Sequence, residues 1–187
     1  MRYRGFNLTA VWLLIGINFL LFIATSINPN LVDVLGLRQA VFIEKPWTIV
    51  TNLFIHWGIW HILANMLTLY FFGSFLSRLV GVRNFLITYF CGGILGNLFY
   101  LLIPPHLLPV IGASGAVYAL AGALVVMVPN LRVLVYFIVP LPLWVVVLVF
   151  FVLWSFLPGV AWQAHLGGLA FGLIMGFFFR RKRRYYY

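Results

Sequence analysis

Long apolar runs with almost no charge inside them restrict most strongly how this chain can fold. Only 7% of the 187 residues are charged, and 65% are hydrophobic. A soluble domain carries about 25% charged residues, so this chain cannot cover a water-facing surface. Disordered chains combine low hydrophobicity with high charge, so disorder is excluded as well. The remaining class is a membrane protein with several helices that cross the bilayer.

Six apolar runs approach the length of about 20 residues that a helix needs to cross a bilayer. We therefore expect an all-α membrane protein, a six-transmembrane-helix bundle that forms a single domain over residues 1–187. The first run is longer than the apolar core of a signal peptide, so we expect an uncleaved anchor. A long outer loop, residues 28–51, follows it and carries apolar residues suited to the membrane interface. The expected spans are residues 9–27, 59–79, 84–103, 114–128, 141–156 and 164–179.

The Lys and Arg residues predict how the bundle is oriented. With six spans, ten of the twelve basic residues fall on one side, and only Arg38 and Lys45 fall on the other. Basic residues concentrate on the cytoplasmic side, so both termini are expected in the cytoplasm and the protein in the cell membrane. The basic residues lie at the edges of apolar runs, which favours a lipid bilayer as the partner and no nucleic acid.

The acidic residues are too few for several kinds of catalysis. Asp33 and Glu44 are the only two, and both lie outside the most apolar runs. Paired carboxylates and a Ser-His-Asp triad therefore lack their acids, and the zinc motif HExxH is absent. Any catalysis must use Ser, His, Cys, Asn, Tyr and the backbone. The single cysteine, Cys91, lies in an apolar run, which predicts a buried thiol.

Polar residues inside apolar runs usually mark a site or a contact between helices. The first such group is GASG at residues 112–115, where Ser114 opens the fourth span. The free amides at a helix start stabilise an oxyanion, and Gly112 and Gly115 allow a tight turn and close approach. A serine that only caps its helix, with glycines that only pack, is the alternative.

The second group is AHLGG at residues 164–168, where His165 opens the sixth span. Small residues follow at four-residue spacing here and in the fourth span, which allows two helices to pack closely. If these stripes face each other, Ser114 and His165 start neighbouring helices and form a Ser-His dyad. A histidine that only joins two helices is the alternative. The stripes are Ala164, Gly168, Gly172 and Gly176, facing Gly115, Ala119 and Ala123.

The third group is HILAN at residues 61–65, near the start of the second span. His61 and Asn65 lie one helical turn apart and both donate hydrogen bonds, so they suit an oxyanion site with the amide of Ser114. Hydrogen bonds between helices are the alternative. His56 is expected to line the same cavity. Tyr118 lies one turn after Ser114, where its ring either holds His165 or simply packs.

In this combination the chain resembles the rhomboid family of intramembrane serine proteases, in what looks like its minimal six-span form. The matching motifs are HxxxN at 61–65, GxSG at 112–115 with Tyr118 following, and AHxxG at 164–168. They occur in family order on the second, fourth and sixth spans. Each motif is weak alone, but the ordered set is specific.

The resemblance implies a role for each residue. Ser114 would be the nucleophile and His165 the general base, with Tyr118 stacked on the imidazole. The amide of Ser114, His61 and Asn65 would bind the oxyanion. The substrates would be transmembrane helices of membrane proteins, cut near the outer face without a cofactor or metal. Supporting positions are His56, Gly112, Gly115 and Gly168.

Two other functions compete with the protease. A non-catalytic rhomboid-like protein would bind and escort transmembrane segments, but its usual marker is a lost Ser or His. A cofactor or transport protein would use His56, His61 and His165, but histidines five residues apart on one helix fit haem or metal poorly. The family often carries a Trp-Arg pair in the first outer loop, and this chain has Trp47-Thr48. That departure concerns how the loop is anchored.

Overall fold

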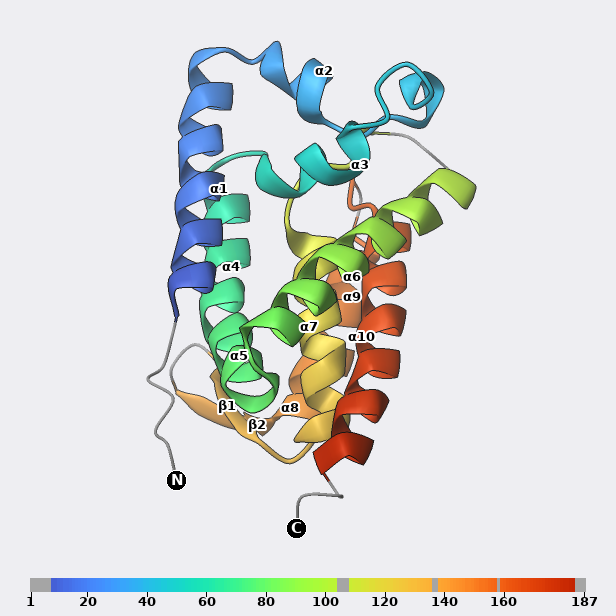
Figure 1. Cartoon of the computed structure of the whole chain (residues 1–187). Coiled ribbons are helices and arrows are strands. Elements are labelled where there is room, and N and C mark those ends of the chain that lie inside the picture. Colours follow the sequence, from blue (N-terminus) through green and yellow to red (C-terminus); the bar gives the residue numbers. More distant parts are fainter. Residues whose placement is uncertain (1–7, 104–107, 136–137, 158, 184–187) are drawn as a thin grey trace.

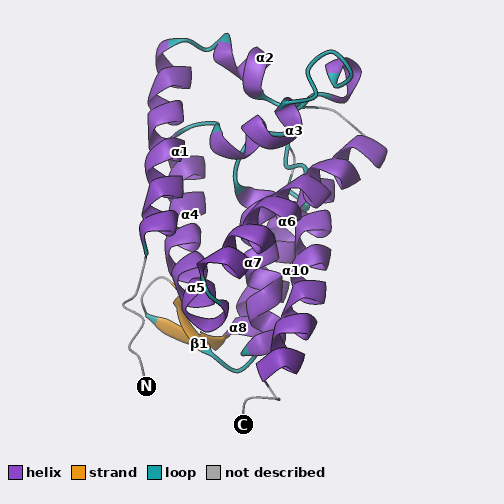
Figure 2. Ribbon diagram, viewed as in Figure 1, coloured by secondary structure: helices purple, strands orange, loops and turns teal. Residues whose placement is uncertain are grey.

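The computed structural model describes residues 8–103, 108–135, 138–157 and 159–183 and is mostly helical (Figures 1 and 2). Four continuous helical runs are each long and apolar enough to cross a membrane. One of them, residues 59–80, changes from α-helix to a π-helical turn and back. The runs are α1 (Thr9–Ile27), α4–η3–α5 (Ile59–Thr68, Leu69–Gly73, Ser74–Val80), α6 (Val82–Leu102) and α10 (Trp162–Arg183).

Two further helical runs are shorter. Helix α7 (Ser114–Met127) has 14 residues and is the most enclosed, with every residue from 115 to 124 buried. The other run begins as α8 (Leu143–Val145), continues as the π-helix η4 (Val146–Val152) and ends as α9 (Leu153–Ser155). The ends of these helices differ by a few residues from the expected spans.

The expectation of an all-α chain is wrong between α7 and α8. Strands β1 (Arg132–Val135) and β2 (Val139–Pro142) form an antiparallel pair. The fifth helical run therefore begins at residue 143, two residues after the predicted start at 141. Proline cannot continue a helix, and it disfavours the helical conformation in the residue before it. Pro140 and Pro142 therefore keep residues 139–142 extended, and the helix starts only at Leu143.

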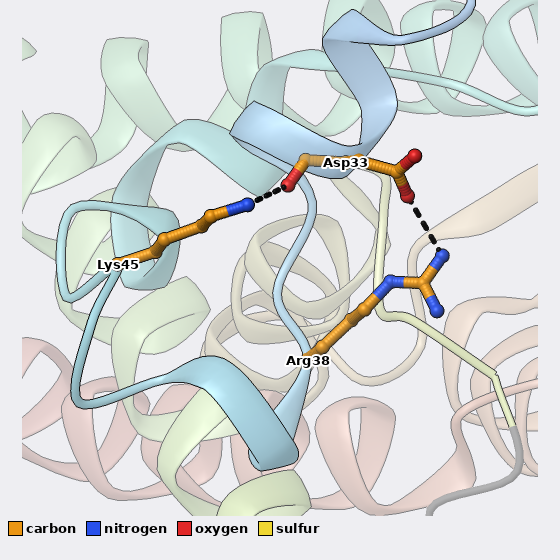
Figure 3. Close-up of polar contacts among 3 residues, drawn as sticks. All are labelled: Asp33, Arg38 and Lys45. Carbon is orange, nitrogen blue, oxygen red and sulfur yellow. Dashed lines mark hydrogen bonds and ion pairs between the residues drawn. The ribbon is translucent and has the colours of Figure 1, made fainter.

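Short helices occupy the segment between α1 and α4: α2 (Leu31–Leu35), η1 (Gln39–Val41), α3 (Thr48–Thr51) and η2 (Asn52–Phe54). Figure 3 shows two polar contacts that tie this segment to itself. The carboxylate of Asp33 accepts a hydrogen bond from Arg38 at 2.9 Å, and its carbonyl accepts one from Lys45 at 2.9 Å. Both contacts are exposed, and an exposed ion pair contributes only about 0–1 kcal/mol.

Trp47 and Thr48 make further contacts in the same segment. The indole of Trp47 donates to the carbonyl of Val34 at 3.0 Å. Thr48 is buried, and its hydroxyl donates to the carbonyl of Lys45 at 2.6 Å. The threonine therefore stabilises the start of α3 through the backbone of its own segment.

A buried pair of asparagines joins this segment to α6. The side-chain amides of Asn52 and Asn97 donate to each other's oxygen, at 3.0 Å and 2.8 Å. Asn97 also donates to the carbonyl of Ile49 at 2.8 Å. The carbonyl of Asn52 in turn accepts the amide of Gly112 at 2.8 Å. The segment is thus connected to the turn that leads into α7.

Helices α7 and α10 pack backbone to backbone through the two stripes of small residues. A methyl group on Gly168, Gly172 or Gly176 would run into the carbonyl of the residue opposite, which is Gly115, Ala119 or Ala123 respectively. The stripes therefore face each other, as their spacing predicts. Helix α6 packs against both of them through its own glycines, Gly92 and Gly96.

The expectation of a buried thiol at Cys91 is wrong. Its side chain is exposed rather than buried. The buried face of α6 is the one that carries Gly92 and Gly96, and Cys91 lies off that face. In a membrane protein an exposed apolar position on a spanning helix faces lipid.

His56 connects the turn before α4 to the start of α7. It is 4% exposed, and its Nε2 accepts the amide of Ala113 at 3.2 Å. The neutral ring then carries its hydrogen on Nδ1, which has no partner among the described residues. Burial, with a smaller contribution from nearby His61, lowers the pKa of His56 to about 3. The ring is therefore uncharged at neutral pH.

We expect Gly172→Ala to destabilise the protein because the new methyl group would push α10 away from Ala119. Overpacking of this kind costs about 1–3 kcal/mol. Thermal unfolding in detergent measures the effect. Gly16→Ala is the matched control, since Gly16 is also helical but has nothing within 4 Å of the added methyl group. Equal melting temperatures for the two variants would contradict the packing described.

Between about pH 6.5 and pH 3 the unfolded chain binds a proton at His56 that the folded chain does not. Stability therefore falls as the pH falls through this range, by up to about 1.4 kcal/mol per pH unit from this residue. In His56→Gln the amide oxygen can accept the amide of Ala113, but nothing titrates. We expect this variant to lose less stability than the wild type between pH 6.5 and pH 4. Chemical denaturation at several pH values measures the free energy of unfolding of both proteins. If that free energy fell equally steeply with falling pH in the wild type and in His56→Gln, the prediction would be contradicted.

Candidate active site

Ser114 and His165 meet where α7 and α10 begin. Ser114 is the first residue of α7, and His165 lies in the first turn of α10. The hydroxyl of Ser114 lies 2.8 Å from Nε2 of His165. Gly115 and Gly168 allow this approach, because a methyl group on either would crowd the backbone of the other helix. The two motifs, 51 residues apart in the sequence, therefore form one site.

Tyr118 and Ser155 hold the imidazole of His165 from two further directions. The ring of Tyr118 stacks on it, with centroids 4.3 Å apart and planes 12° apart. The hydroxyl of Ser155 lies 2.8 Å from Nδ1 of His165 and 2.8 Å from the hydroxyl of Tyr118. The histidine is thus held at both nitrogens and on one face.

Ser155 is the site residue that sequence reasoning missed. It ends the helical run 143–155 and is buried, at 4% exposed. Its spacing to the motif at 164–168 matches no helical repeat, because α9 ends at Ser155 and α10 begins only at Trp162. The only available signal was a polar residue at the end of an apolar run.

His61 lies against the turn that leads into α7. Its Nδ1 accepts the amide of Trp57 at 3.2 Å, so the neutral ring carries its hydrogen on Nε2. A methyl group on Gly112 would lie 2.9 Å from that Nε2, and the φ angle of Gly112 is +115°. Only glycine adopts this conformation without strain. A hydrogen-bond donor therefore lies beside the residues that precede Ser114.

Asn65 and His56 surround His61. The side chain of Asn65 donates to the carbonyl of His61 at 2.9 Å, one turn earlier in α4, and its amide nitrogen carries a second hydrogen. The rings of His56 and His61 contact edge to face, with centroids 5.0 Å apart. His56 also fixes the amide of Ala113, as described above. His56 and His61 thus lie against the turn into α7, and Asn65 lies one helical turn after His61.

This arrangement suits nucleophilic chemistry. A hydroxyl paired with an imidazole, which is itself oriented by a third group, is the pattern of an activated nucleophile. The amides at the start of α7 have no partner within the helix, and with His61 they suit an oxyanion. In the described part of the chain, no three His, Cys, Asp or Glu side chains are grouped so that they could hold a metal ion.

Comparison with known proteins places this chain in a family. Residues 44–182 match the family model of the rhomboid domain. "Rhomboid protein 1, mitochondrial" of Saccharomyces cerevisiae is 31% identical over 163 residues, and the match covers 76% of this chain and 44% of the yeast protein. "Putative rhomboid protease YdcA" of Bacillus subtilis is 32% identical over 160 residues, and the match covers 81% of this chain and 77% of that protein.

A further relative, "Rhomboid protease GluP" of Bacillus subtilis, is 30% identical over 123 residues, and the match covers 62% of this chain and 24% of that protein. The chain thus spans less than half of the yeast relative and about three quarters of YdcA. The matched region contains all three motifs. With its apolar helices, the chain is a multi-pass membrane protein, and it belongs to the rhomboid family.

Proposed function

We propose that the protein is a serine endopeptidase that cuts transmembrane segments of other proteins inside the membrane, with Ser114 as nucleophile and His165 as general base. The observation that carries this proposal is the 2.8 Å contact between the Ser114 hydroxyl and Nε2 of His165. The names of two relatives support the same activity, since GluP is named a rhomboid protease and YdcA a putative one.

The reaction follows the order of acyl transfer. Nε2 of His165 takes the proton of the Ser114 hydroxyl while the oxygen attacks the carbonyl carbon of the scissile peptide bond. The tetrahedral intermediate breaks its carbon–nitrogen bond, and the imidazolium returns the proton to the leaving amine. Water then attacks the acyl-enzyme with the same base, which releases the acid product and restores Ser114.

The oxyanion of the intermediate needs donors that are already in position. The amide of Ser114, Nε2–H of His61 and the second amide hydrogen of Asn65 are the proposed donors. Such groups act strongly in a site that excludes most water. Gly112 supports the arrangement by bringing the backbone close to His61.

The proposed topology has six crossings, formed by α1, α4–η3–α5, α6, α7, the run 143–155 and α10. The start of α1 and the end of α10 lie at one end of the bundle, with the turn between α5 and α6 (Figure 1). The starts of α4, α7 and α10 face the other end. Because the basic residues concentrate at the first end, both termini are proposed in the cytoplasm, with the site toward the outer face of the cell membrane.

We expect the wild-type protein to react with a fluorophosphonate, in which the Ser114 oxygen displaces fluoride from phosphorus. Ser114→Ala removes the nucleophile and His165→Ala removes the base, so neither variant is expected to label. Gel detection of the labelled protein measures this, and cleavage of a transmembrane substrate is assayed in parallel. The control is a thermal unfolding curve for each variant.

The outcomes separate the two functions. Labelling and cleavage by the wild type alone support the protease. A folded wild type that neither labels nor cleaves, but still captures transmembrane segments, would favour the escort protein instead. Cleavage by Ser114→Ala at the wild-type rate would rule out the proposed nucleophile.

We expect His61→Ala and Asn65→Ala each to lower kcat by about 10²–10³-fold, the usual effect of removing an oxyanion donor. Substrate binding should change little, because these donors act on the charge that develops in the intermediate. Leu67→Ala on the exposed face of α4 is the control, since Leu67 is 51% exposed. Variants that keep the wild-type kcat would exclude His61 and Asn65 from this role.

A further inference from the structure

Ser155 is a buried polar residue at the site that no motif explains. It ends the helical run 143–155 and lies between His165 and Tyr118, at 2.8 Å from each. Its side chain is enclosed, with the residue only 4% exposed. A buried hydroxyl at hydrogen-bond distance from a proposed general base affects which of the two ring nitrogens of that base carries the hydrogen.

We propose that Ser155 is a positioning residue that sets the tautomer of His165, by accepting a hydrogen bond from Nδ1–H. This inference deepens the proposed function and rests on His165 acting as the base. Ser155 does not touch the reacting atoms. It acts through the imidazole, on the side opposite Ser114.

The argument starts from the two nitrogens of a neutral imidazole. One carries a hydrogen and the other has a free lone pair. To take the proton of Ser114, Nε2 of His165 must be the bare nitrogen, so Nδ1 must carry the hydrogen. A buried N–H that lacks an acceptor is unfavourable. The oxygen of Ser155, 2.8 Å from Nδ1, supplies that acceptor.

The opposite tautomer fits the same distances but cannot do the chemistry. In that state Ser155 donates its hydrogen to Nδ1, and Nε2–H donates to Ser114. The base then has no lone pair for the proton of Ser114. The choice between these two states therefore decides whether the dyad works. Ser155 favours the first state when it donates its own hydrogen to the hydroxyl of Tyr118, 2.8 Å away, because its oxygen can then only accept from Nδ1–H.

A hydroxyl is a suitable acceptor in this environment. A carboxylate buried among membrane helices is costly unless it is paired. The chain has only two acidic residues, Asp33 and Glu44, and both lie in the segment between α1 and α4. Asp33 pairs with Arg38 in that segment. A neutral hydroxyl orients the histidine without placing a charge in the bundle.

Tyr118 fixes Ser155 in turn. Its hydroxyl lies 2.8 Å from that of Ser155, while its ring stacks on the imidazole. Ser114 and Tyr118 lie one turn apart on α7, so the contacts form a closed circuit: from Ser114 to His165, to Ser155, to Tyr118 and back to α7. The circuit joins three helical runs around one ring.

The test compares Ser155→Thr with Ser155→Val, which have almost the same shape and differ in one hydroxyl. Ser155→Ala accompanies them. We expect Thr to keep kcat within about threefold of the wild type. Val and Ala should lower kcat at least about tenfold, up to the 10²–10⁴-fold that a positioned base contributes, with KM nearly unchanged. Thermal unfolding of the Thr and Val variants controls for packing.

A spectroscopic readout tests the tautomer without any activity. In protein labelled with ¹⁵N-histidine, the His165 signals are assigned by their loss in His165→Ala. We expect an Nδ1–H tautomer in the wild type and in Ser155→Thr, and a mixture or the Nε2–H tautomer in Ser155→Val. A structural role for Ser155 alone would leave this spectrum unchanged.

The outcomes distinguish this inference from the proposed function. An Nε2–H tautomer in the wild type, or a Val variant with wild-type kcat, overturns the role of Ser155 while the protease stands. Equal losses in Thr and Val with unchanged tautomers overturn it as well. A wild type that neither labels nor cleaves overturns the protease, and the nitrogen spectrum then still decides whether Ser155 sets the tautomer.

Discussion

The backbone contact between α7 and α10 is the constraint on which the site depends. Lipid surrounds a membrane protein with an environment as apolar as its own side chains, so helices associate through close packing and hydrogen bonds. Here the carbonyl of Gly115 meets Gly168 and that of Ala119 meets Gly172, so backbones rather than flexible side chains set the spacing. The fixed spacing of the two helices also fixes the distance between the residues at their starts, Ser114 and His165. Tyr118 then falls on the histidine simply because it follows Ser114 by one turn.

The polar groups of the site are arranged in pairs without formal charges. His56 accepts the amide of Ala113, His61 accepts the amide of Trp57, and His165 lies between two serine hydroxyls. Charges buried in a membrane are costly, and a neutral hydrogen-bonded imidazole avoids that cost. Among the three, His165 has a partner at both ring nitrogens. Two of these histidines have a tautomer assigned by a backbone amide, and the third depends on side chains from α7 and α9. The ring of the proposed base, His165, is therefore the one whose tautomer depends on side chains that a substitution can remove.

Helical spacing predicts the contacts made along regular helices. It does not predict contacts that form where the chain reverses direction. The facing stripes, the meeting of Ser114 with His165 and the stacking of Tyr118 all follow from residues three or four positions apart on regular helices. Ser155 escapes the same reasoning because it reaches His165 across a turn whose path no local pattern describes. The hairpin of β1 and β2 escapes it because strands of four residues carry no helical spacing, and only its last two residues, 141–142, fall within the expected fifth span. The exposure of Cys91 escapes it because an apolar run does not by itself show which side of the helix faces the bundle, which in α6 is the side of Gly92 and Gly96.

The length of α7 limits how far this helix reaches across the bilayer. Its 14 residues span about 21 Å, whereas the hydrocarbon core of a bilayer is about 30 Å thick. Its neighbours α6 and α10, with 21 and 22 residues, are long enough to cross. A helix as short as α7 cannot reach both headgroup regions, so at least one of its ends lies within the hydrocarbon core. How far inside that end lies depends on the acyl chains of the surrounding lipids as much as on the protein.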